Sequence, residues 1–167
     1  TTLGRRLTNL FSEEDRLLYR LVADMRIAEF DNFLRKFNRT QCWEKYNLTI
    51  LSEPLAQHYG LETDWLDITN DFNVALFFAC CYWDYNAKKW HPLTKKQTEV
   101  NSQTQYGVIF HTPARVVALE NIVKSTSGSD EGMILPIGYQ PFMRCHSQYG
   151  YGMHMKTSIP LQNNLIF

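Results

Sequence analysis

Apolar positions in the first third of the chain recur with a helical period. Ser12 followed by three acidic residues predicts a helix start, because a serine side chain accepts free N–H groups and negative charge is favourable at the positive end of the helix dipole. Apolar residues then recur three or four apart, which predicts a long amphipathic helix through Phe37. A short helix is expected over Ser52 to Tyr59, with Pro54 in its first turn and Gly60 past its end.

Shorter elements follow this helical part. Thr63 to Thr69 favours an extended segment, and Thr69 or Asp71 is expected to cap an apolar, central helix. We expect residues 38–46 and 86–105 to be irregular, because they show no sustained period. Further strands are predicted at 107–112, 115–119, 134–137 and 151–157. The sequence thus predicts an α+β fold with N-terminal helices packed on a mostly antiparallel sheet.

Composition and charge narrow the possible functions. Seventeen basic and seventeen acidic residues cancel, so there is no strong nucleic-acid signal. No apolar run approaches the length of a membrane span and no export signal opens the chain, which predicts a cytoplasmic protein without a membrane segment. Four cysteines without a CxxC pair favour free thiols. His146 and His154 lack a ligand spacing, so no metal site is expected.

The densest polar chemistry lies between Leu55 and Ala79. Asp67 stands in an apolar strand, where a half-buried carboxylate needs partners. It either caps the next helix or accepts backbone donors, or it binds a hydroxyl or cation of a ligand, or it is an exposed residue at the sheet edge. His58 has an ordinary pKa near neutrality, which suits an acid or base, but it could equally lock its helix to the strand by hydrogen bonds.

Four further polar residues are candidates for a site. Gln57 and Thr69 can orient a ligand or tie loops together. Arg144 can clamp a phosphate, with internal pairing to Asp67 or Asp64 as the alternative. Gln148 follows Arg144 by four residues, and nearby glycines allow the bend that would bring both to one place.

The run of 14 residues from Ala56 to Thr69, AQHYGLETDWLDIT, precedes the apolar helix VALFFA. This pattern resembles the signature of the FRG domain, a bacterial and phage-borne family, and the segment PFMRCHSQYG at 141–150 resembles a later motif of that family. The sequence departs from the family pattern at Glu62, Asp64 and Ile68, and no phenylalanine-arginine-glycine motif precedes Leu55. We therefore expect residues 1–167 to form a single FRG-like domain without its N-terminal motif.

The resemblance implies an ADP-ribosyltransferase-like fold and an enzyme that uses NAD as substrate, although no glutamate stands near Gln148 in the acid position such enzymes use. It assigns catalytic roles to His58, Asp67 and Gln148, and nucleotide binding to Gln57, Thr69 and Arg144. The alternative is a non-catalytic module that binds a nucleotide or a protein in a regulatory role. The setting of such domains further implies a part in phage defence. No particular protein partner follows from the sequence.

Overall fold

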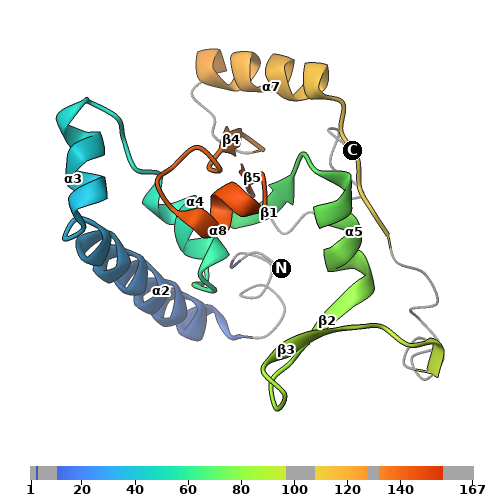
Figure 1. The fold of residues 1–167 in the computed structure, drawn as a ribbon. Coiled ribbons are helices and arrows are strands. Elements are labelled where there is room, and N and C mark those ends of the chain that lie inside the picture. Colours follow the sequence, from blue (N-terminus) through green and yellow to red (C-terminus); the bar gives the residue numbers. More distant parts are fainter. Residues whose placement is uncertain (1–2, 4–10, 97–107, 128–131, 156–167) are drawn as a thin grey trace. The chain divides into compact units, whose positions relative to one another are not determined.

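A computed structural model describes residue 3 and residues 11–96, 108–127 and 132–155 (Figure 1). The chain divides into two compact units. The larger comprises Thr1–Asn70 and Thr112–Phe167, and the smaller comprises Asp71–His111. All six candidate site residues belong to the larger unit.

The long predicted helix of the larger unit is present. Helix α2 covers Glu13–Leu34, and the Ser12 side chain accepts a hydrogen bond from the Asp15 N–H, as expected of an N-cap. The helix ends at Leu34, three residues before the predicted limit. Residues 38–46 are not irregular as predicted, because Asn38–Lys45 forms helix α3. Arg35, just past α2, pairs with Glu44 of α3 at 2.7 Å, a contact between neighbouring helices that a local pattern does not reveal.

The other helices of the larger unit are short, apart from α7. Helix α4 spans Ser52–His58, followed by Gly60 at a φ of +85°, so this predicted helix and its glycine stop are confirmed. Helix α7 covers Ala114–Ser127 and helix α8 covers Met143–Ser147. The strand predicted at 115–119 is therefore wrong. The Asn121 side chain exchanges two hydrogen bonds with the backbone of Ile134, at 2.8 and 3.0 Å, and this fixes α7 to the sheet.

A three-stranded antiparallel sheet holds the larger unit together. Its strands are β1 (Trp65–Thr69), β4 (Ile134–Pro136) and β5 (Gly150–His154), in the order β1-β5-β4. Asp67 lies opposite Gly152 in the register. Figure 1 shows α4 and α8 beside this sheet. The predicted α+β fold, with helices first and an antiparallel sheet later, is confirmed.

Three apolar clusters surround these elements. One joins Leu34, Leu55, Ile137 and Cys145, and thereby binds α2, α4 and α8 together. A second joins Ile134, Met153 and Met155 on the sheet, with Val117 of α7 packed against it, and a third joins Leu3 and Ala23. Within the described ranges, no helix has the length and apolarity needed to cross a bilayer.

The smaller unit contains one helix and one hairpin. Helix α5 (Phe72–Cys80) is capped by Asp71, whose side chain accepts from two backbone N–H groups, as predicted. Strands β2 (Cys81–Asp84) and β3 (Lys89–Pro92) pair antiparallel, so part of the predicted irregular stretch is a strand. No residue of α5 is buried, and the predicted central position is not confirmed. Residues 108–113 form no strand, contrary to the prediction, and Gly107 lies outside the described residues.

Candidate functional site

A histidine and an aspartate face each other where α4 meets β1. His58 is the last residue of α4 and is only 4% exposed. Its Nε2 atom lies 3.1 Å from Oδ1 of Asp67, in the middle of β1. The Asp67 side chain is 42% exposed, so the pair has a buried member and a solvent-facing member. His58 thus locks its helix to the strand, and it also contacts the carboxylate that the sequence singled out.

Gln148 fixes the other side of the imidazole ring. Its Oε1 lies 3.0 Å from Nδ1 of His58. An amide oxygen only accepts, so Nδ1 carries a proton in this arrangement. In the neutral ring Nε2 is then bare, and it faces a carboxylate oxygen that also lacks a proton when ionised. Apart from this approach, Nε2 has no hydrogen-bond partner in the described part of the chain. A further proton shared by His58 and Asp67 would relieve the repulsion.

The Asp67 carboxyl has an altered pKa that fits this arrangement. Burial raises the pKa of Asp67, while the positive charges of His58 and Arg144 partly offset the rise. Surrounding protein atoms desolvate the carboxyl group even though 42% of the side chain remains accessible. The carboxyl is therefore better able to hold a proton than an ordinary surface aspartate.

Thr69 contributes to the position of Gln148. Its hydroxyl donates to the backbone oxygen of Gln148 at 2.7 Å, which ties the end of β1 to the residue that follows α8. Four of the six predicted residues, namely His58, Asp67, Thr69 and Gln148, are therefore connected in one set of contacts. Tyr149 next to Gln148 has a φ of +47°, which gives the sharp turn from α8 into β5.

The other two predicted residues have different surroundings. Gln57 accepts a hydrogen bond from the Thr63 hydroxyl at 2.9 Å, and Thr63 in turn accepts from the Trp65 N–H. Gln57 thus connects α4 to the loop before β1, which is one of the two roles predicted for it, the other being to orient a ligand. The Arg144 guanidinium lies over the Tyr59 ring, 5.7 Å from its centroid. Arg144 forms no salt bridge with Asp67 in the described structure.

Two features of the site were missed by the sequence reasoning, namely the partner of Asp64 and the close approaches at Gly150 and Gly152. Asp64, 3% exposed, pairs with Arg20 of α2 rather than with Arg144. A Cβ on Gly150 would lie 3.2 Å from the His58 ring, and a Cβ on Gly152 would lie 2.8 Å from Pro54. Two glycines spaced two apart in a strand are a readable signal of close approach to the backbone. The cap of α5 is Asp71, as predicted, so the alternative role of Asp67 as a helix cap is not the one that the structure shows.

Two pockets lie along α2 and α3, with volumes of about 360 and 570 Å³. Neither is lined by any of the six predicted residues. Among the described residues, no group of three His, Cys, Asp or Glu side chains is arranged to hold a metal ion. All four cysteines are free thiols, and burial raises the pKa of the Cys145 thiol to about 11.

These features define an α+β domain in which a helix-terminal histidine faces a strand aspartate across a polar network. The model of the FRG domain family matches residues 1–88, more than half of the 167-residue chain. The chain belongs to the FRG domain family. A search of curated proteins and a search of solved structures gave no match. The matched region contains His58 and Asp67, while Arg144 and Gln148 lie beyond it.

Proposed function

We propose that this FRG domain is an enzyme that cleaves the bond between nicotinamide and ribose in NAD, with Asp67 as its reactive carboxylate. The observation that carries the proposal is the 3.1 Å approach of His58 Nε2 to the half-exposed Asp67. A buried imidazole behind an accessible carboxyl group is an arrangement that can place a proton or a negative charge at the protein surface.

The chemistry of NAD cleavage suits such a group. When the bond from nicotinamide to the ribose C1′ breaks, its electron pair leaves with nicotinamide and the ribose acquires oxocarbenium character. A carboxylate beside C1′ stabilises this positive charge. Water then attacks C1′, and the Asp67 and His58 pair accepts the proton that water loses. The products are ADP-ribose, nicotinamide and one proton.

In this proposal Thr69 and Gln148 act as positioning residues. The Thr69 hydroxyl donates to the Gln148 backbone, and Oε1 of Gln148 contacts His58. Their polar groups hold the imidazole in one orientation and one tautomer, as second partners of catalytic histidines commonly do. The direct contact with substrate then falls to Asp67.

The test is to incubate the purified protein with millimolar NAD and to measure nicotinamide by chromatography. Asp67→Asn should lower the rate at least about 100-fold, because it removes the negative charge without changing the shape of the side chain. Asp24→Asn, an exposed carboxylate on α2, is the matched control and should retain the wild-type rate. If the wild-type protein neither binds NAD nor releases nicotinamide, the proposal is wrong.

A second candidate function is nucleotide or protein binding without turnover, as a regulatory module. It is favoured because the polar groups of Thr69 and Gln148 are hydrogen-bonded to other residues of the site and not presented to a ligand. In this function the contacts among these residues serve as a structural scaffold. Calorimetric binding of NAD with no release of nicotinamide would support this function over catalysis. His58→Ala then distinguishes scaffold from site: loss of the fold points to a scaffold, and a folded protein that no longer binds points to a site.

A further inference from the structure

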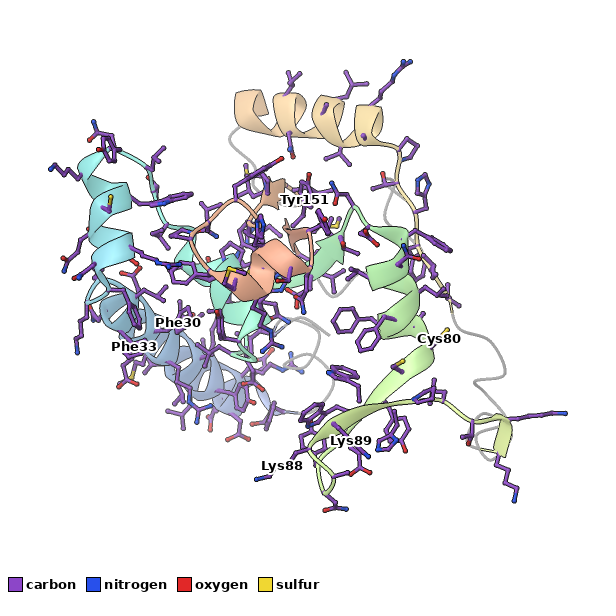
Figure 2. All side chains as sticks on the ribbon, in the orientation of Figure 1. Phe30, Phe33, Cys80, Lys88, Lys89 and Tyr151 are labelled. Atoms are coloured by element: carbon purple, nitrogen blue, oxygen red, sulfur yellow. The ribbon has the colours of Figure 1, made fainter. Side chains whose placement is uncertain are left out.

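The larger of the two pockets lies where α2 ends and α3 begins, and its volume is about 570 Å³. This volume is within the usual range for sites that bind small molecules. Its walls come from α2, the start of α3, Tyr59 and the segment before α8. Figure 2 labels Phe30 and Phe33 on α2, which are two of its lining residues.

Aromatic rings form most of the apolar part of this pocket. They are Phe30, Phe33, Phe37, Tyr59 and Phe142. Phe33 and Phe37 meet edge to face with centroids 5.0 Å apart, and Phe30 lies 5.8 Å from Tyr59. Phe33, Phe37 and Tyr59 remain about half exposed, so ring surface is available for stacking. A planar aromatic ligand would bury this surface.

The charges at the same pocket are all positive. Lys36 and Arg39 line it, and Arg144 lies over the Tyr59 ring. None of the described residues that line it is acidic, although the whole chain has no net charge. Phe37 is the N-cap of α3 and provides no capping hydrogen bond, so the positive end of that helix dipole adds to the field of the two cations. The charge is complementary to a phosphate group.

We propose that this pocket binds a nucleotide, with its base stacked on the Phe37 and Tyr59 rings and its phosphates beside Lys36 and Arg39. Stacking explains why the rings are exposed, and phosphate binding explains why only cations accompany them. The inference goes beyond NAD cleavage, because it requires no reaction at Asp67. Tyr59 directly follows His58, so a ligand at this pocket would contact the residue next to the proposed catalytic pair.

Isothermal titration of the full chain with ADP tests this inference, with adenosine and inorganic pyrophosphate as partial probes. ADP should bind at least tenfold more tightly than either, since each fragment retains only half of the contacts. ADP affinity should also fall as salt rises, because ionic contacts are screened. If ADP shows no binding up to millimolar concentration, the inference is overturned.

Variants separate the two halves of the pocket. The double change Lys36→Gln and Arg39→Gln should weaken ADP binding at least tenfold and leave adenosine binding unchanged. Tyr59→Leu should weaken the binding of both ADP and adenosine and leave the affinity for pyrophosphate unchanged. Lys45→Gln, at the opposite end of α3, is the matched control and should bind ADP as the wild type does. Thermal unfolding of each variant verifies that it is folded. ADP binding that none of the pocket variants alters would also overturn the inference.

The outcomes for the two proposals are distinguishable. If ADP binds through Lys36 and Arg39 but nicotinamide is never released, nucleotide binding at the pocket is supported and the cleavage reaction is refuted. If nicotinamide is released and the pocket variants bind ADP as tightly as the wild type does, the cleavage reaction is supported and the nucleotide pocket is refuted.

Discussion

Gly152 allows α4 to lie directly on the backbone of β5, and its replacement by alanine should disturb both stability and the site. A Cβ at this position would lie 2.8 Å from Pro54 Cβ and 2.9 Å from Trp65 Cε3. An ordinary contact begins near 3.4 Å, so α4 or the Trp65 ring has to move by about 0.6 Å. The indole is 7% exposed and has little room to move.

Overpacking of this kind costs about 1–3 kcal/mol. For a chain of this size, each kcal/mol lowers the melting temperature by about 2–4 °C, so Gly152→Ala should melt about 2–12 °C below the wild type. Because Pro54 and His58 belong to the same short helix, the shift should also move the imidazole relative to Asp67, which is opposite Gly152 in the sheet.

Urea and thermal unfolding measure the stability change, and the ¹⁵N shifts of the His58 ring report the change in its contact with Asp67. Gly60→Ala is the comparison: no atom would lie within 4 Å of its Cβ, and its cost arises only from the φ of +85°. Gly60→Ala should leave the His58 ring signals unchanged. The reasoning is refuted if Gly152→Ala is as stable as the wild type and its His58 signals do not move.

Three further predictions concern charged or ionisable groups. The stability contributed by the buried Cys145 thiol is fully present below pH 9 and should be lost as the pH rises through its pKa of about 11, a loss that Cys145→Ala abolishes in urea titrations; the exposed Cys42 and Cys80 should react with thiol reagents before Cys145 does. Because burial raises the pKa of Asp67, the stability that its protonated carboxyl group contributes is present below the ordinary pKa of 3.8 and declines as the pH rises through the raised folded-state pKa. Urea unfolding should therefore show Asp67→Asn gaining stability relative to the wild type as the pH rises above 3.8; a constant difference would contradict this. Arg20→Ala should lower the free energy of unfolding by about 1–3 kcal/mol, because the buried Asp64 carboxylate loses its ion pair with the Arg20 guanidinium, and Arg20→Lys should restore part of the loss; equal stability of the alanine variant would show that the pair contributes little.

Elements fixed by local rules could be predicted from the sequence. Ser12 and Asp71 cap their helices by bonding to N–H groups two or three residues ahead, and Gly60 ends α4 in a conformation that suits glycine. These contacts are all within a few residues, so a local pattern contains the necessary information. Strands β4 and β5 were also found, because their apolar runs match a buried sheet.

Elements fixed by distant contacts were not predicted. The β-branched residues near Arg115 favour a strand locally, but α7 forms and is tied to β4 by Asn121. Helix α3 has no side-chain cap, and the partner that pairs with its Glu44 is Arg35 after α2. No periodicity within either segment contains this information.

The candidate site follows the same division. His58 and Asp67 were found because they stand in a recognisable ordered run, and Gln148 because of a later motif. The contacts among these three residues could not be predicted, because the two ring nitrogens of His58 contact Asp67 and Gln148, which are 9 and 90 positions away in the sequence. The pairing of Asp64 with Arg20 was missed for the same reason, as 44 residues separate the two.

The pairing of β1 with β5 has a consequence for how the protein is made. The paired residues, from Thr69 with Gly150 to Trp65 with His154, are more than 80 positions apart. Closing so long a loop is entropically costly, and contacts of this range slow folding. During synthesis α4 and β1 leave the ribosome long before their partner strand exists. The surfaces that will face β5 must stay soluble through that interval, which is a selective pressure on this chain quite separate from any chemistry at Asp67.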